Sequence, residues 1–170
     1  ILIPKITSLS ARGYRVIAIQ YPVVWTHELL ICGLELLLEE RVCELDAALA
    51  QTVAYLKDRR QFGRTIGSFQ AVQHRLAECA IEVEASRWLV REAAGISDGG
   101  EAGCVAAAFA LDAAGRIFAE THQLSGAIGF TREHDLHVWS MRLHALRQEL
   151  GGVQAHRKAI VDARWSEARP

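Results

Sequence analysis

Side chains that could bind a charged ligand are concentrated near the middle of the chain, in residues 55–77. Three arginines, Arg59, Arg60 and Arg64, stand beside an aromatic residue, Phe62. A guanidinium offers forked donors that suit an anionic pyrophosphate. The same cations would also be stabilised at the C-terminus of a helix, where the helix dipole contributes about 0.3–1 kcal/mol. The residues alone therefore leave two interpretations open, an anion site and a helix end.

A second candidate segment is the loop from Gln123 to Ala127. Gly126 within it lets backbone amides approach a ligand closely. Ala127 requires a negative φ, because alanine at a positive φ is strained. An ordinary turn between two helices is the alternative interpretation.

A carboxylate, Glu133, follows this loop. A carboxylate held against an acidic C–H bond can remove its proton as a general base. The alternative is that Glu133 lies in the first turn of a helix capped by Thr131, which is a common arrangement at helix starts.

Two further patterns carry weaker indications. The stretch Gly95-Ile-Ser-Asp-Gly99 matches the G-x-S-x-G pattern of a nucleophile elbow, but that turn must follow a strand, and the residues before it are helical. We therefore interpret Ser97 as part of an interhelical loop. The histidines at 134, 137 and 144 lack an obvious third metal ligand, so we expect them to be solvated or at an interface, with no metal site.

The elements that position these residues are predicted from apolar periodicity. Val42, Leu45, Leu49, Val53 and Leu56 recur at steps of three and four, as on one face of a helix. Gly63 and Gly67 separate two helices, and Ser68 is a potential N-cap for the second. Helices are expected over 29–58, 69–94, 104–124, 133–148 and 153–165. Short links between them predict an all-α, antiparallel helical bundle.

The first residues have a different pattern. Residues 15–20 form a short β-branched run between Gly13 and Pro22, which predicts a strand. We expect a segment of unclear structure over 1–28 and the helical bundle over 29–170. The stretch 13–22 is similar to an early strand and loop of α/β-hydrolases.

Composition excludes several classes of function. The net charge of −1 over 170 residues gives no electrostatic case for binding nucleic acid or an anionic membrane. The longest apolar runs, such as 104–111, are shorter than the about 20 residues of a membrane span. Cysteines 32, 43, 79 and 104 form no C-x-x-C pair, and Cys43 and Cys79 are expected on apolar helix faces. Reduced cysteines and no signal peptide predict a cytoplasmic protein.

The order and spacing of the two candidate segments resemble the acyl-CoA dehydrogenase family. The similarity spans 36–152 and includes Arg59, Gln61-Phe62-Gly63, Ile66-Gly67, Phe69-Gln70 and the segment from Gln123 to Glu133. The resemblance implies the family's C-terminal helical domain, with FAD as cofactor and an acyl-CoA as substrate. It implies Glu133 as the base, with Arg59 reaching the flavin pyrophosphate across a dimer interface. It also implies FAD contacts from Gln61, Phe62, Phe69, Gln70, Gln123, Gly126 and Ala127.

The sequence departs from the family pattern in three ways. Gly126-Ala127 stands where the family usually has two adjacent glycines. The arginine and acidic residue that touch acyl-CoA in the family fall near Leu34 and Ile31 here. The family's helical N-terminal and middle β-domains are absent, and the chain starts at Ile1 with Met141 as its only methionine.

We therefore expect a piece of a longer protein, active only with the missing domains or a partner subunit that supplies them. Such a chain would form a homo-oligomer or pair with a second flavoprotein subunit. The alternative is a non-catalytic helical module that retains the bundle for association.

Overall fold

The computed structural model describes residues 6–11, 14–19, 27–96, 100–148 and 151–165. It divides into two compact units, Ile1–Leu30 and Ile31–Pro170. The first unit contains a hairpin of β1 (Ile6–Ala11) and β2 (Tyr14–Ile19), paired antiparallel from Ile6↔Ile19 to Ala11↔Tyr14. The strand expected at 15–20 therefore corresponds to β2, and its partner β1 was not predicted. This two-stranded hairpin is not the parallel sheet of an α/β-hydrolase.

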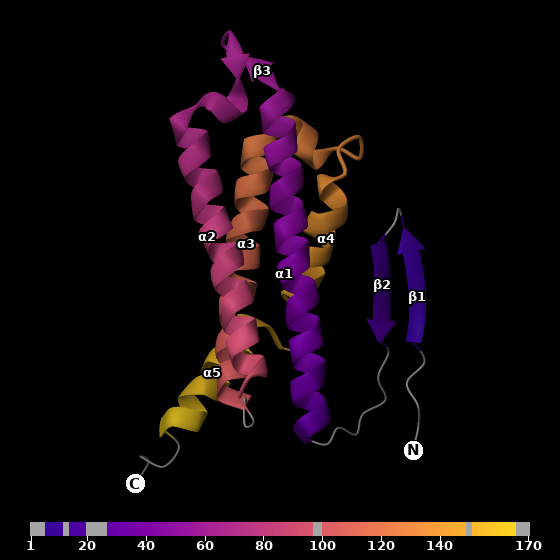
Figure 1. Cartoon of the computed structure of the whole chain (residues 1–170), viewed down its shortest axis with the longest axis vertical. Coiled ribbons are helices and arrows are strands. Elements are labelled where there is room, and N and C mark those ends of the chain that lie inside the picture. Colours follow the sequence, from indigo (N-terminus) through magenta and orange to yellow (C-terminus); the bar gives the residue numbers. More distant parts are fainter. Residues whose placement is uncertain (1–5, 12–13, 20–26, 97–99, 149–150, 166–170) are drawn as a thin grey trace. The chain divides into compact units, whose positions relative to one another are not determined.

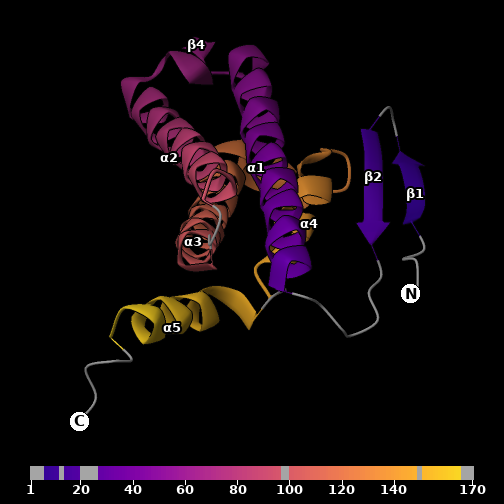
Figure 2. The ribbon, with the colours of Figure 1, turned by 60° about the horizontal axis from the view of Figure 1, so that its bottom comes forward.

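The second unit is a helical bundle, which confirms the predicted fold class. Its helices are α1 (His27–Asp58), α2 (Gln70–Ala94), α3 (Gly100–Ser125), α4 (Leu136–Leu146) and α5 (Gly152–Trp165). Helices α1 to α4 lie side by side and alternate in direction (Figure 1). Helix α5 packs on α3 and crosses the end of the bundle at which α3 begins (Figure 2).

The core of the bundle lies where α1, α2 and α3 meet. Helix α3 contributes small side chains, because alanines at successive turns let its neighbours approach closely. The buried core residues include Leu38, Val42, Leu45, Leu49, Val83, Val90, Ala106, Ala107, Ala110, Ala113, Ala114 and Ile117. This core position explains the composition of α3.

In the part of the chain that the structure describes, Gly100–Phe130 is long and apolar enough to span a membrane, with a mean hydropathy of 1.5. Half of the most apolar 18-residue stretch of this segment is buried inside the bundle.

Two predicted helix caps were wrong. Ser68 does not cap α2, because its Oγ donates to the Thr65 carbonyl at 2.7 Å, and Phe69 occupies the N-cap position. Thr131 does not cap α4, because its Oγ1 donates to the Ile128 carbonyl at 2.9 Å. In both places the hydroxyl donates to the backbone carbonyl three residues earlier, at a short 3₁₀ turn (Ile66–Ser68 or Gly126–Phe130). Such local bonds are a common alternative to helix capping for these residue types. Helix α4 consequently begins at Leu136 rather than at residue 133.

The cysteine prediction was half right. Cys79 is buried on α2, and burial raises the pKa of its thiol to about 11, as expected of an inert core cysteine. Cys43 is exposed instead, because Val42 and Leu45 form the buried stripe of α1 at that level. The described cysteines 43, 79 and 104 are all free.

Candidate functional site

The arginine segment forms a tight hairpin between α1 and α2. Strand β3 (Arg60–Gln61) pairs antiparallel with β4 (Arg64–Thr65), leaving Phe62 and Gly63 as the loop. Both loop residues have a positive φ, 54° and 78°, as a two-residue type I′ turn requires. The hairpin was not predicted from the sequence, because Phe-Gly lacks the asparagine or aspartate that usually marks such a turn.

Phe62 is the unusual residue of this hairpin. A non-glycine residue at positive φ costs about 1–2 kcal/mol. Phe62 also leaves 88% of its surface exposed at the hairpin tip. A strained, exposed aromatic residue is a feature of contact sites, since most of its surface makes no contact in the isolated unit.

The arginines of the hairpin are available to bind an anion. The guanidinium of Arg64 lies 3.8 Å above the Phe69 ring, and Phe69 meets Phe62 edge-on with centroids 6.3 Å apart. Arg59 and Arg60 are exposed and form no ion pair with any described residue. The Arg59 amide donates to the Tyr55 carbonyl at 2.9 Å, so Arg59 also directly continues the last turn of α1. The helix-end interpretation therefore holds for its backbone, while its side chain is free to bind.

The second segment is a compact loop after α3. Its 3₁₀ turn, η2 (Gly126–Phe130), begins with Gly126 at φ 66°, whereas Ala127 does not take a positive φ. Gln123 and Ala127 are exposed. At Gly129 an added Cβ would lie 2.9 Å from the Ser125 Cβ, so the loop closes tightly on the end of α3.

The loop rests on a histidine that sequence analysis missed. His122 is 6% exposed and lies between Phe118 and Phe130, with ring centroids 4.5 and 4.7 Å away. Neither ring nitrogen has a hydrogen-bond partner among the described residues. Burial lowers the pKa of His122, and the nearby His134 and His144 lower it further. No pattern in the sequence distinguishes this histidine from the exposed ones.

Glu133 lies in the turn between η2 and α4, three residues before the helix begins. Its side chain is exposed and makes no hydrogen bond or ion pair with the described residues. Glu133 therefore does not lie in the first turn of α4, which was the alternative interpretation.

Both candidate segments lie at the same end of the bundle. The β3–β4 hairpin joins α1 to α2 there, and the η2 turn joins α3 to α4 there (Figure 1). A ring contact lies beside them, since Tyr55 on α1, four residues before Arg59, meets His134, in the turn after η2, edge-on at 5.2 Å. Free guanidiniums and the backbone amides of a glycine turn are donors that suit the pyrophosphate of a flavin dinucleotide, and an exposed aromatic ring offers it an apolar contact. The residues present at this end therefore fit FAD.

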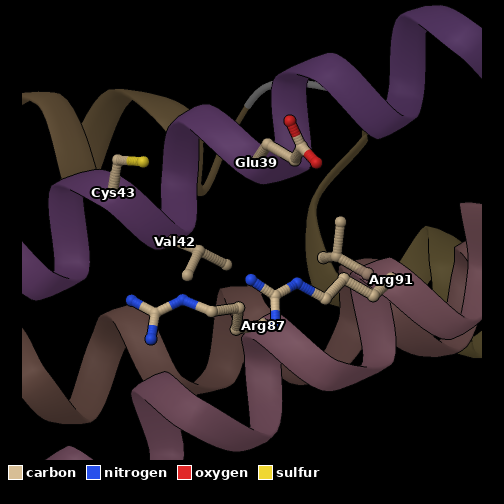
Figure 3. Close-up of a pocket in the computed structure, with 6 residues that line it drawn as sticks. Glu39, Val42, Cys43, Arg87 and Arg91 are labelled. Atoms are coloured by element: carbon tan, nitrogen blue, oxygen red, sulfur yellow. The ribbon is translucent and has the colours of Figure 1, made fainter.

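The pocket between α1 and α2 is a different feature. Figure 3 shows Glu39 and Cys43 on one side and Arg87 and Arg91 on the other, with Val42 between them. Its volume is about 140 Å³, below the about 300 Å³ at which ligand pockets begin. Arg87 is engaged by Glu84 and Asp46. The pocket is too small for FAD or acyl-CoA.

The other residues that the sequence singled out are Gln61, Gln70, Ser97, Ile31 and Leu34. Gln61 and Gln70 are exposed on the hairpin and at the start of α2. Residues 97–99, with Ser97, lie outside the described residues, but α2 leads directly into Gly95, so a helix precedes that motif. The side chains of Ile31 and Leu34 also lie outside the described part. No group of three metal-ligating side chains occurs in the described ranges.

Comparisons with known proteins place the chain in a family. The model of the acyl-CoA dehydrogenase C-terminal domain matches residues 40–164. Acyl-CoA dehydrogenase IpdE2 of Mycolicibacterium smegmatis is 38% identical over 116 residues, covering 68% of this chain and 37% of that protein. Acyl-CoA dehydrogenase FadE34 of Mycobacterium tuberculosis is 41% identical over 110 residues, covering 61% of this chain and 16% of that protein.

Solved structures agree. A variant of the Tcur3481-Tcur3483 steroid ACAD superposes with a TM-score of 0.77 at 33% identity, covering 84% of this chain and 40% of that one. Butyryl-CoA dehydrogenase from Megasphaera elsdenii gives a TM-score of 0.74 at 26% identity, covering 81% and 37%. The chain thus spans less than half the length of these relatives. It belongs to the acyl-CoA dehydrogenase family and corresponds to the C-terminal helical domain.

Proposed function

We propose that this chain is the C-terminal part of an FAD-dependent acyl-CoA dehydrogenase that desaturates an acyl-CoA thioester between its α and β carbons. The supporting observation is that the arginine hairpin and the Gln123–Ala127 loop lie at one end of the bundle, where Tyr55, before the hairpin, contacts His134, after the loop.

The hairpin and the loop would hold the cofactor together. The Arg59 guanidinium would bind the pyrophosphate, with Phe62 and Phe69 as apolar contacts. Gln61, Gln70 and Gln123 would supply amide hydrogen bonds, and the Gly126 and Ala127 backbone would approach most closely. FAD, when bound, supplies the hydride acceptor for the β carbon.

Glu133 is the proposed base for the α proton. Its carboxylate is exposed at the same end and free of other partners among the described residues, so it is available to a substrate. A general base requires access to its proton donor first and a suitable pKa second.

The proposed activity belongs to a larger assembly. The chain spans 37% of the length of IpdE2, so further domains or a partner subunit would complete the flavin and acyl-CoA sites. We propose a homo-oligomer, or a complex with a second flavoprotein subunit, in which Arg59 serves a flavin bound mainly by the neighbouring chain.

The cofactor assignment is tested by flavin absorbance of the completed protein. Arg59→Ala should weaken FAD binding about 10- to 100-fold, because a charge-assisted contact contributes about 1.5–3 kcal/mol. Arg59→Lys should recover only part of it, since lysine lacks the fork. Arg157→Ala, at an exposed arginine on α5 at the other end of the bundle, is the matched control and should bind FAD normally. Equal binding by Arg59→Ala would refute the assignment.

The base assignment is tested by comparing the three carboxylates that follow the loop, Glu133, Asp135 and Glu149. Glu133→Gln should abolish desaturation while the protein keeps its bound flavin. Asp135→Asn and Glu149→Gln should retain turnover. Loss of turnover at Asp135 or Glu149 with an active Glu133→Gln would move the role to that residue.

The alternative function is a non-catalytic association module. The exposed apolar side chains of α2, Ile81 and Trp88, favour it. A completed protein that assembles through α2 and never binds flavin would establish this alternative.

A further inference from the structure

His122 supports the loop to which the proposed function assigns cofactor contacts. It lies in the last turn of α3, directly before Gln123, and is 6% exposed. Phe118, one turn earlier, and Phe130, at the end of η2, enclose its ring, with centroids 4.5 and 4.7 Å away. Its Nδ1 lies 3.6 Å from the position that a Cβ on Gly129 would take. The η2 turn therefore closes directly on this imidazole.

The closed turn leaves the polar atoms beneath it without partners. Neither ring nitrogen of His122 has a hydrogen-bond partner among the described residues, and neither has the Oγ of Ser125, which is 4% exposed. A neutral imidazole carries one N–H donor, whereas an imidazolium carries two and a full charge. A buried charge without a partner is much less stable than a buried neutral group. The closed turn therefore accepts the neutral form of His122 and disfavours the cation.

The groups that face His122 from other elements act in the same direction. Burial lowers the pKa of His122, and His134 from the turn before α4 and His144 from α4 lower it further. Glu120, two residues earlier on α3, pairs instead with Arg75 of α2. The last turn of a helix favours a cation through the helix dipole, but the lowered pKa shows that burial outweighs this effect.

The enclosure has one weak side. Phe130 covers the His122 ring but leaves 73% of its own surface in water, so few contacts hold it in place. A protonated His122 can therefore reach water by displacing Phe130, and the η2 turn that carries Phe130 would move with it.

We propose that His122 is a positioning residue that makes flavin binding depend on pH: the neutral imidazole holds the η2 turn closed on α3, and its protonation opens the turn and displaces Gln123 and the Gly126 backbone from the cofactor. The inference rests on the proposed function, because it assumes that this loop contacts FAD. His122 is covered by the two phenylalanine rings and touches no cofactor itself.

The sign of the pH dependence follows from the two states of the turn. In water the pKa of a histidine is about 6.5, and in the closed turn the pKa of His122 is lower. Above about pH 6.5 the imidazole is neutral in both states, so flavin affinity is constant. Below it the open turn binds a proton that the closed turn excludes, which favours the open turn by up to about tenfold per pH unit. A direct attraction between a histidine cation and the anionic cofactor would produce the opposite trend.

The experiment is a flavin titration of the complete flavoprotein at several pH values between about 5.5 and 8. Flavin affinity of the parent should be constant above about pH 7 and fall about fivefold or more by pH 5.5. In His122→Leu it should not change with pH, because the titrating group is gone. His144→Gln should show a smaller fall, because one of the charges that oppose protonation of His122 is removed.

Two variants are controls for the titrating group. Ser125→Ala removes a buried polar atom under the same turn and does not change a titrating group. His74→Leu removes an exposed histidine on α2. Both should keep the pH profile of the parent, and circular dichroism at each pH checks that every variant is folded.

The outcomes separate this inference from the proposed function. A parent protein whose flavin affinity is constant over the whole range, or rises as the pH falls, would overturn the role of His122 and leave the flavin assignment intact. A His122→Leu variant that keeps the fall of the parent would do the same. A complete protein that binds no FAD at any pH would overturn both. If His122→Leu does not fold, His122→Gln, which is polar and does not titrate, provides the same comparison.

Discussion

Phe62 shows how a single residue can indicate a function. Its backbone is in the left-handed region and its ring is exposed, so the isolated unit would be more stable with another residue there. A position whose residue costs stability and makes few contacts is expected where a ligand or neighbouring chain supplies the missing contacts.

Phe62→Asn should therefore separate stability from binding. Asn-Gly is the preferred pair for a type I′ turn, so the free energy of unfolding should rise by about 1 kcal/mol. Flavin affinity should fall at the same time, because the aromatic contact is lost. Chemical denaturation and a flavin titration measure the two effects. A variant that is less stable than the parent would contradict the strain argument.

His122 predicts a pH dependence of stability. Burial lowers its pKa in the folded chain, so the unfolded chain binds more protons as the pH falls below the ordinary value of about 6.5. The free energy of unfolding should decrease with falling pH from there until the pH passes below the folded pKa. His156 is shifted in the same direction by burial and by Arg41, and adds to the slope.

The measurement is denaturation at several pH values between about 5 and 7.5. His122→Leu should flatten part of the slope and leave the part that belongs to His156. A slope unchanged in His122→Leu would mean that His122 is not neutral and buried in solution.

At the scale of the element, sequence periodicity was sufficient for the helices. The three- and four-residue spacing of Val42, Leu45 and Leu49 reports the face of α1 that is buried, and this face is set by local geometry. The connections were less predictable. Ser68 and Thr131 have the chemistry of caps, but their hydroxyls donate to the carbonyls three residues earlier, a local alternative to capping that residue type does not distinguish.

The candidate site was also only partly predictable from the sequence. The positions of Arg59 and Gln123 could be selected by their residue types and by a family resemblance. The contact of Tyr55 with His134 joins residues far apart in the chain, on α1 and in the turn before α4. No spacing within one segment encodes such contacts, so the sequence alone did not reveal them.

The η2 turn depends on a glycine for a steric reason. An added Cβ at Gly129 would lie 2.9 Å from the Ser125 Cβ, closer than real Cβ atoms approach. Gly129→Ala should therefore destabilise the chain by about 1–3 kcal/mol and loosen the loop that carries Gln123. Gly100→Ala is the matched control, since no atom of the described residues lies within 4 Å of its added Cβ, and it should not destabilise. Thermal unfolding of the two variants compares them, and equal stability would contradict the close approach.

At the scale of the whole molecule, α2 carries an apolar face that the bundle leaves uncovered. Ile81 and Trp88 are 67% and 65% exposed and lie seven residues apart, two turns along one face of the helix. Two copies related by a two-fold axis could pack these helices antiparallel, which would set Ile81 of each copy against Trp88 of the other. Such a pairing covers both side chains at once, whereas a monomer leaves both in water.

We therefore expect at least a dimer, with α2 at the interface. Light scattering coupled to size exclusion at micromolar concentration should give a mass of at least twice 18.8 kDa. The double variant Ile81→Glu/Trp88→Glu should be monomeric, because an antiparallel pairing would bury its carboxylates without partners. Met141→Glu, at an equally exposed apolar residue on α4, should not change the mass. A parent chain that elutes at the mass of one copy would refute the α2 interface, and it would also weaken the proposal that Arg59 serves a flavin held by a neighbouring chain.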